Sequence, residues 1–241
     1  MKITTARLLL RPLCMQDAPA IQKYFPHWEI VRQLSAKAIT WPYPPDGAQK
    51  FLRNIALPAM KRGEDWYVGI TRKDDPAGEV IGVVHLRRDT ASGNRGIWLA
   101  ADFQGKGYMQ EAVTALNDYA FDVLGFDKLI IKNAAENTAS RKLKQKTAAR
   151  HIATVPASHY LDGCPAQDIW ELTATEWRSF RALAAGRPLQ AAPSPLCRPQ
   201  PVPLPLWSRA SLGDAFAGAL SASAQMAARC APCPAFMPRP V

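Results

Sequence analysis

The sequence predicts an α/β fold in which a mixed, mostly antiparallel sheet is flanked by helices. Three observations predict it. Short apolar runs typical of strands alternate with segments of helical periodicity. Glycine, proline and aspartate clusters separate these segments in the manner of turns. The 241 residues, 48% of them hydrophobic, suffice for one sizeable core.

The first elements follow from apolar runs and breakers. Residues 7–11 are apolar up to Pro12 and predict a strand, and Asp17 is placed to cap a short helix that runs toward Tyr24. Residues 41–45 contain three prolines, which excludes a helix there because proline has no N–H and restrains its predecessor.

A second helix is predicted after Asp46, which is placed to cap it. Pro58 should kink or divide this helix, and Gly63 should end it. Its apolar face is expected to consist of Phe51, Leu52, Ile55 and Met60.

Three strands with hairpin-like turns between them are expected at residues 66–71, 80–87 and 96–99. A helix from Tyr108 to Leu124 follows, and Gly125 is placed to terminate it in the left-handed conformation. Its apolar positions are Val113, Leu116, Ala120 and Val123.

The last predicted elements are three short strands and one helix. Residues 128–132 form a β-rich run, and Asn137 can cap the helix that carries Leu143. Strands near residues 152–155 and 169–172 complete the predicted layer.

The chain changes character near its C-terminus, so we expect a folded domain over residues 1–182 and a disordered tail over residues 183–241. The tail is rich in Pro, Ala and Arg and has no helix or strand periodicity. A recognition peptide for a proline-binding domain is the sharper alternative for it. Cys230 and Cys233 form a CxxC, but no second pair or His cluster completes a zinc site, so no metal is expected.

Composition also bounds location and partners. No apolar run is long enough to cross a membrane and no secretory signal opens the chain, which indicates a cytoplasmic protein. The net charge of +10 is spread along the chain with acids interleaved. This suits anionic ligands in general but makes nucleic acid an unlikely partner. The sequence leaves open whether the protein is a monomer or a homodimer.

The most informative segment is the glycine-rich stretch Gln104, Gly105, Lys106, Gly107, Tyr108 and Met109. Glycines allow main-chain N–H groups to converge, and a helix that begins at once adds unpaired N–H groups and the positive end of its dipole. Lys106 adds a positive charge. The segment predicts a cradle for a diphosphate, although an ordinary tight turn would read the same way.

The motifs around this loop form an ordered series that is more specific than the loop alone. They are residues 5–13 with 17–18, residues 96–112, 118–121, 124–126, 131–133 and 136–141, then residues 170–173 with 176–177. This series resembles the GCN5-related N-acetyltransferases, the GNAT superfamily. Within it, the branch of the bacterial ribosomal-protein N-terminal acetyltransferases is similar over about residues 3–180.

The resemblance implies a GNAT-like acyl-coenzyme A N-acyltransferase fold. It also implies transfer of acetyl from acetyl-coenzyme A, as co-substrate, to a primary amine without a covalent acyl-enzyme. The loop Gln104–Met109 would hold the diphosphate. Asn137 and the strand end at Leu99 would hold the pantetheine arm, and Ser140 would offer a hydroxyl near the departing sulfur.

The remaining chemistry is less determined. Many relatives carry a Tyr as general acid where Lys144 stands here, so Ser140 or water must serve. His85, on a predicted strand, is a candidate general base because an imidazole has an unperturbed pKa of about 6.5. Asn137 as a helix cap and His85 as a packed residue are the structural alternatives.

Two positions depart from the family pattern. Met109 stands where the family usually has Gly or Ala, and Ala148 lies where a Gly would give a left-handed helix end.

Three functions therefore stay open. The first is an active N-acetyltransferase that acts on a protein N-terminus or a small amine. The second is a catalytically weak or inactive acyl-coenzyme A-binding module for regulation or interaction. The third and weakest is a basic adaptor that docks on ribosomal RNA.

Overall fold

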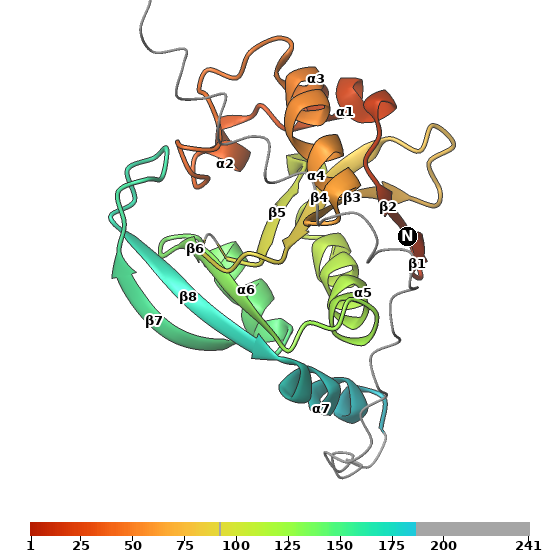
Figure 1. The fold of residues 1–241 in the computed structure, drawn as a ribbon, viewed down its shortest axis with the longest axis vertical. Coiled ribbons are helices and arrows are strands. Elements are labelled where there is room, and N and C mark those ends of the chain that lie inside the picture. The colour runs from red at the N-terminus through yellow and green to blue at the C-terminus, as the bar shows by residue number, and fades with distance from the viewer. Residues whose placement is uncertain (92, 187–241) are drawn as a thin grey trace, which may run out of the picture. The chain divides into compact units, whose positions relative to one another are not determined.

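Two antiparallel sheets carry the fold (Figure 1). The structure is a computed structural model that describes residues 1–91 and 93–186, so the predicted tail lies almost entirely outside the described residues. The first sheet has the order β1-β2-β3-β4-β5 and the second the order β6-β8-β7. The strands are β1 (Ile3–Thr4), β2 (Leu8–Pro12), β3 (Asp65–Arg72), β4 (Val80–Arg87), β5 (Arg95–Leu99), β6 (Lys128–Ala134), β7 (Arg150–Pro156) and β8 (Ala166–Thr173).

Helices lie in the connections between the strands and after β8. They are α1 (Ala18–Tyr24), α2 (Trp28–Val31), α3 (Gly47–Phe51), α4 (Leu57–Arg62), α5 (Tyr108–Asp122), α6 (Thr138–Lys146) and α7 (Ala174–Ala184). Short turns of other helix types are η1 (Met15–Asp17), η2 (Leu52–Ala56, a π-helix) and η3 (Ala101–Phe103). The predicted fold class is confirmed. Strand β1 and helices α2 and α7 are additions that the sequence did not indicate.

The two faces of the first sheet pack against different helices because side chains alternate along a strand. Tyr67 and Val83 point into the core formed with α1, α3, η2 and α4. Val68 and Val84 point into the core formed with α5, which also receives the second sheet and Trp177 of α7. The indole Nε1 of Trp177 donates a 2.9 Å hydrogen bond to Asp118 of α5.

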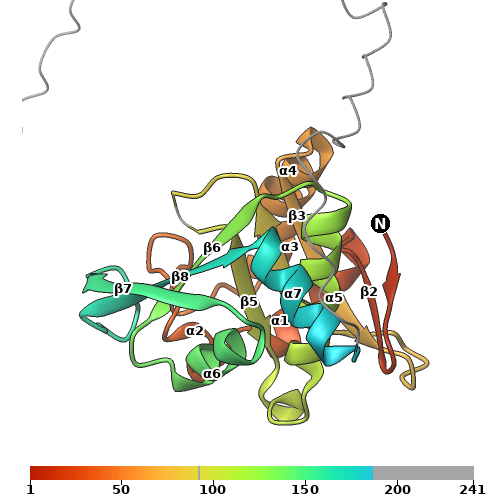
Figure 2. The same cartoon turned by 90° about the horizontal axis from the view of Figure 1, so that it is seen from below.

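One residue joins the two sheets at the base of β5 and β6. Asn94, 1% exposed, donates its main-chain N–H to the carbonyl of Ile130, and its Oδ1 accepts the N–H of Ile130, both at 2.6 Å. Its Nδ2 donates to the carbonyl of Arg87 at 3.1 Å. Beyond this point β5 and β6 belong to different sheets and diverge toward the ends that lead to α5 and α6 (Figure 2).

Two predicted helix caps are wrong. Asp17 does not cap α1: its carboxylate accepts the N–H of Cys14 at 2.8 Å and pairs with Arg11 at 2.7 Å, which closes the preceding turn η1. Asp46 makes no capping hydrogen bond to α3 and instead pairs with Lys50. In both places the carboxylate pairs with a nearby cation and makes no bond to the first N–H groups of the helix.

Two predicted core positions are exposed. Ile55 lies in the π-turn η2, whose extra residue rotates it out of the apolar face, and its exposed fraction is 51%. Leu52 and Ala56 are the buried positions of that turn. Val123 follows the last residue of α5 and is 65% exposed, because the helix ends one residue earlier than the apolar pattern.

The expected break at the end of α6 is present. Ala148 adopts a φ of +60°, the only non-glycine residue with a positive φ among those described. The main-chain N–H of Ala149 then reaches back to the carbonyl of Lys144 at 3.0 Å. A methyl group in this conformation costs roughly 1–2 kcal/mol.

We therefore predict that Ala148→Gly stabilises the protein by about 1 kcal/mol. Strain relief exceeds the extra freedom that glycine gives the unfolded chain. Urea unfolding followed by circular dichroism measures the change. Ala149→Gly is the matched control: Ala149 is buried and has no positive φ, so this variant should lose stability. A loss in both variants would contradict the strain.

Asn94→Ala should destabilise the fold by about 2–3 kcal/mol, because it leaves buried main-chain groups of Ile130 and Arg87 without their partners. Asn54→Ala, at an exposed position of η2, is the control and should change the free energy of unfolding little. Equal urea midpoints for the two variants would show that Asn94 does not hold the sheets.

Candidate functional site

The glycine-rich loop lies between β5 and α5, as predicted. Gly105 and Gly107 have φ values of +73° and +81°, which orient the loop so that α5 begins at Tyr108. Among the described residues, no group accepts a hydrogen bond from the main-chain N–H groups of residues 105–110. A methyl group at Gly105 would meet nothing within 4 Å, so the space beside it is open. The loop thus presents free donors at the positive end of a helix dipole.

Arg7 anchors this loop from the far end of the sequence. Its Nη1 donates to the carbonyl of Lys106 at 3.0 Å, its Nε pairs with Glu111 at 2.7 Å, and its guanidinium lies 4.5 Å from the centre of the Tyr108 ring. A methyl group at Gly107 would approach Arg7 Nη2 to 3.3 Å. Sequence reasoning missed Arg7, because no local pattern joins residues so far apart.

Glu111 completes the anchor and is more than a charge that complements the helix dipole. It also accepts hydrogen bonds from Thr5 Oγ1 at 2.6 Å and from the main-chain N–H of Arg7 at 2.8 Å. Burial alone would raise the pKa of Glu111, but the bonds from Thr5 and Arg7 outweigh it and lower that pKa. An ionised Glu111 therefore ties the start of the chain to the first turn of α5.

The other loop residues have structural partners. Gln104 Nε2 donates to the carbonyl of Leu99 at 2.9 Å, which closes the end of β5. The side chain of Met109 packs against the α5-side core, so it does not block the helix start. Lys106 extends over the Phe103 ring at 5.8 Å and forms no ion pair with a described carboxylate.

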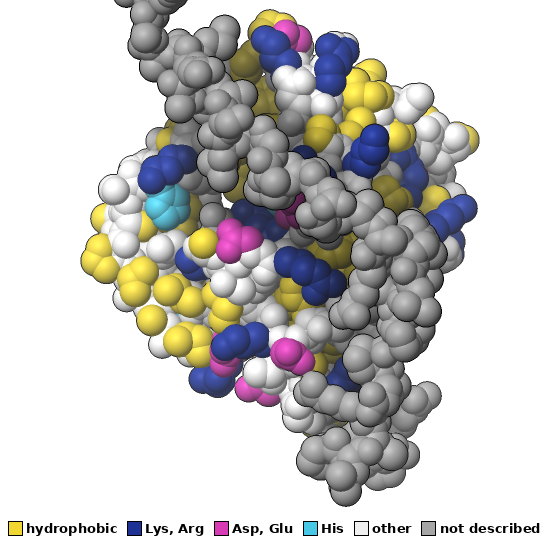
Figure 3. All heavy atoms as spheres, in the orientation of Figure 1, with side chains coloured by type: hydrophobic (Ala, Val, Ile, Leu, Met, Phe, Trp, Pro, Cys, Tyr) yellow, Lys and Arg dark blue, Asp and Glu magenta, His cyan; other side chains and the backbone are white. Residues whose placement is uncertain are grey.

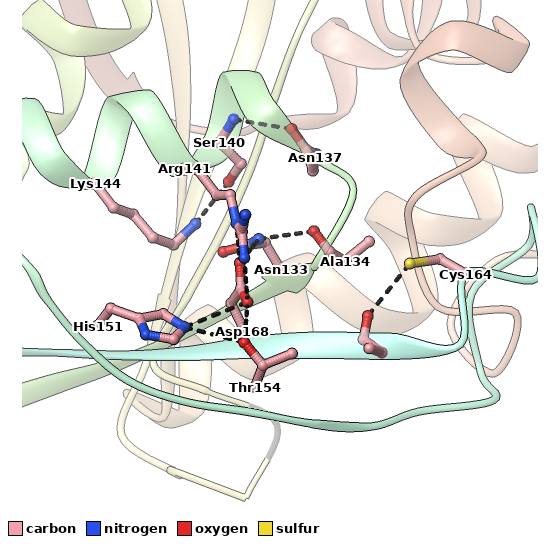
Figure 4. Close-up of polar contacts among 11 residues, drawn as sticks. Asn133, Ala134, Asn137, Ser140, Arg141, Lys144, His151, Thr154, Cys164 and Asp168 are labelled. Carbon is pink, nitrogen blue, oxygen red and sulfur yellow. Dashed lines mark hydrogen bonds and ion pairs between the residues drawn. The ribbon is translucent and has the colours of Figure 1, made fainter.

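The strands β5 and β6 diverge and leave a split between the two sheets. Helix α6 begins on the other side of this split from the loop. Asn137 caps it: Oδ1 accepts the main-chain N–H of Ser140 at 2.8 Å. The hydroxyl of Ser140 accepts a 2.6 Å hydrogen bond from Nζ of Lys144, one turn further on (Figure 4). The predicted Asn137 and Ser140 therefore meet at one helix start, in the structural role that the sequence allowed.

Asp168 of β8 clamps α6 to the second sheet. Its buried carboxylate accepts bonds from Arg141 Nη2 at 2.9 Å, Thr154 Oγ1 at 2.7 Å and Asn133 Nδ2 at 3.2 Å (Figure 4). Burial would raise the pKa of Asp168, but these donors, Arg141 first, lower it well below its usual value. No sequence pattern indicates this cluster, because its members come from four elements of the fold.

His85 lies on β4 of the first sheet and stacks on Tyr67, on the face that packs against α1 and α3. The centres of the two rings are 3.8 Å apart. Its Nε2 is 2.9 Å from Asp65 Oδ2, and its Nδ1 is 3.0 Å from Arg87 Nη2, so both ring nitrogens are engaged. Burial, and then the charge of Arg87, lower the pKa of His85 to about 4. These contacts and the lowered pKa favour a neutral imidazole that is fixed in place. No hydrogen bond among the described residues joins His85 to Ser140.

The lowered pKa of His85 predicts an acid-sensitive fold. Between about pH 6.5 and pH 4 the unfolded state binds a proton at this histidine and the native state does not, so stability falls as pH falls through that window. We expect the wild type to lose on the order of 2–3 kcal/mol more than His85→Gln between pH 7 and pH 4.5. Urea unfolding at both pH values measures it, and parallel losses would refute it.

A surface groove of about 820 Å³ runs along α5 beside β1 and meets the glycine-rich loop at Gly107 and Gln110. Its lining includes Glu111, Asp118 and Asp122, each of which is paired with an arginine. Such a lining does not favour phosphate groups, so we place the candidate site at the split between β5 and β6 and not in this groove.

Together the split sheet and the loop of free N–H groups define an acyltransferase domain of the GNAT type. Residues 7–150 match the family described as acetyltransferase (GNAT) domain, and the chain therefore belongs to that family. An uncharacterized N-acetyltransferase, p20 of Bacillus licheniformis, is 25% identical over 139 residues, which are 58% of this chain and 76% of the relative.

Solved structures share the fold. The ribosomal-protein-S5-alanine acetyltransferase of Vibrio fischeri has a TM-score of 0.62 and 18% identity, and the match covers 73% of this chain and 98% of that one. RimJ of Mycobacterium smegmatis, in complex with CoA-disulfide, has a TM-score of 0.60 and 20% identity, over 75% and 90% of the two chains.

Three further observations concern partners. The part of the chain that the structure describes contains no helix long and apolar enough to cross a membrane. Its described residues hold no group of three or more His, Cys, Asp or Glu side chains that could bind a metal ion. On the face shown in Figure 3, basic side chains lie among acidic and apolar ones and form no continuous patch.

Proposed function

We propose that this protein transfers an acetyl group from acetyl-coenzyme A to a primary amine by direct attack. The observation that carries the proposal is the loop of residues 105–110, whose free N–H groups stand at the start of α5 beside a split in the sheet. Such a loop suits a diphosphate, and the split gives an extended thiol arm access to the free edge of β5.

Each group of residues has a task in this reaction. The loop Gln104–Met109 holds the diphosphate, with Lys106 adding charge. Leu99 at the end of β5 and Asn137 at the start of α6 flank the pantetheine arm. Bound acetyl-coenzyme A supplies the acetyl thioester. Main-chain N–H groups of β5 that face the split polarise its carbonyl, and Ser140 stands beside the sulfur.

The base that deprotonates the amine is proposed to be His85, acting through water. Its neutral ring can accept a proton, but its lowered pKa and its contact with Arg87 make it a weak base. Asp65, bound to Nε2, would stabilise the imidazolium that forms.

The acceptor is proposed to be a protein N-terminus or a small amine that enters beside the loop of residues 26–46. This loop is fixed to the β7–β8 connection, because Ala36 donates to the carbonyl of His159 at 2.7 Å and Asp162 donates to that of Arg32 at 2.8 Å. Two exposed aromatic rings, Trp28 and Trp41, lie 5.5 Å apart on it. The name of the Vibrio fischeri neighbour, a ribosomal-protein-S5-alanine acetyltransferase, favours a protein acceptor. A cytoplasmic location stays a prediction.

A binding module without turnover is the second candidate. The engaged nitrogens of His85 and the absence of a Tyr at position 144 favour it. Isothermal calorimetry with acetyl-coenzyme A, followed by a thiol-release assay with N-terminal peptides, polyamines, aminoglycosides and amino acids, separates the two. Thiol release above the acceptor-free rate supports the enzyme. Heat of binding with no release on any amine supports the module, and no heat at all overturns both.

Lys106→Ala should weaken acetyl-coenzyme A binding by about five- to tenfold and reduce its dependence on salt, because it removes an unpaired positive charge beside the diphosphate. Calorimetry at two salt concentrations measures both effects. Lys61→Ala, an exposed lysine of α4, is the matched control. If the two variants bind equally, the diphosphate does not sit on this loop.

A further inference from the structure

The middle of α6 contains a buried lysine that the reaction described above does not use. Lys144 is 2% exposed, and the hydroxyl of Ser140, at 2.6 Å, is its only hydrogen-bond acceptor among the described residues. Lysines are almost never fully buried, and an ammonium group carries three donors. One acceptor in a buried site satisfies a neutral amine far better than it satisfies a charged one.

The charges that face Lys144 favour the neutral form as well. From β5 comes Arg95, fully buried, whose Nη1 donates to Asn117 of α5 at 2.9 Å and whose Nε has no partner. From β8 comes Asp168, whose carboxylate is already bound to Arg141. Burial, and then Arg95, lower the pKa of Lys144 well below 10.5, and Asp168 only partly opposes them.

Ser140 connects this amine to the candidate site. It stands in the first turn of α6, half-buried, whereas Lys144 lies one turn deeper with its Nζ directed back at the Ser140 hydroxyl (Figure 4). A hydroxyl both donates and accepts, so a proton can pass from its outer side to the amine and return. Ser140 is also the residue proposed to stand beside the sulfur.

We propose that Lys144 is a proton-storing residue that acts through Ser140 during acetyl transfer. This inference rests on the proposed function. Lys144 does not touch the substrate, so it is a positioning residue for the proton and Ser140 is the group in contact.

The protons balance as follows. Lys144 starts as a neutral amine. When the acceptor ammonium loses a proton, Ser140 takes it and passes its own to Nζ. The amine nitrogen then forms its bond to the acetyl carbon, and the bond to sulfur breaks with the electron pair on sulfur. Ser140 gives its proton to sulfur and regains one from Lys144. The second proton of the acceptor nitrogen leaves through water to His85, the base proposed above, and from there to solvent.

Lys144→Met tests the proposal, because methionine is unbranched and apolar and its side chain is only one atom shorter than that of lysine. We expect kcat to fall about 10- to 100-fold with little change in KM. We expect the urea midpoint to rise, because an amine next to Arg95 is no longer buried. A purely structural lysine would give the opposite sign of stability or leave kcat unchanged. Lys142→Met, exposed on the same helix, should change neither quantity.

Two pH-dependent quantities, kcat and stability, test whether Lys144 takes up and returns the proton. In the wild type, kcat should fall as pH drops and Lys144 becomes charged, and this limb should vanish in Lys144→Met. Stability gives a second readout that needs no substrate. From neutral pH to about pH 10 the unfolded state binds a proton at Lys144 that the native state lacks. As the pH rises over this range, the stability of the wild type therefore rises relative to that of Lys144→Met. The difference between their urea midpoints becomes smaller.

A double-mutant cycle completes the test. Ser140→Ala should lose as much kcat as Lys144→Met, and the double variant should lose no more than either. An unchanged kcat and pH profile in Lys144→Met, or a constant gap in urea midpoint, overturns the relay while the wild type still acetylates amines. If the wild type turns over no amine, the relay and the proposed function fall together.

Discussion

The rest of the structure depends on how Asn94 joins two sheets at one end only. Its buried main-chain and side-chain groups bond Ile130 and Arg87, so β5 and β6 start side by side. After that point each strand keeps a partner on one edge and diverges on the other. The split leaves main-chain groups of β5 free to bind an extended ligand, and it directs the ends of β5 and β6 into the helices that carry the candidate site.

Different interactions stabilise the N-terminal ends of α5 and α6. The start of α5 leaves N–H groups unpaired and is held by an exposed ion pair between Arg7 and Glu111. The start of α6 is capped by Asn137 and held from beneath by the buried carboxylate of Asp168. An anion can therefore bind at α5, whereas α6 supplies a hydroxyl that is fixed in place. The positive φ of Ala148 lies beyond the C-terminal end of α6, at the opposite end of that helix from Asn137.

Much of the fold could be predicted from the sequence, because strands β2 to β8 and helices α1, α5 and α6 have strong apolar patterns and breakers. The errors have local causes. The carboxylates of Asp17 and Asp46 pair with cations instead of capping helices, and the π-turn η2 rotates Ile55 away from the core. Helix α7 was missed although Thr173 and Glu176 form a capping box, because its apolar face is short.

The sequence by itself indicated the family, from motifs spread over about residues 3–180. It also located the glycine-rich loop and the helix cap Asn137, since each of these two depends on neighbours within a few positions. It also indicated Ala148 as a position that lacks the glycine of a left-handed helix end, and left open whether the helix ended by another route. Only the tertiary structure decided what faces these residues: Arg7 on the loop, Arg95 and Asp168 around Lys144, and Arg87 against His85. Burial and charge at such positions come from segments far apart in the chain. A pattern of nearby residues therefore cannot reveal which lysine has a lowered pKa or which histidine has both ring nitrogens engaged.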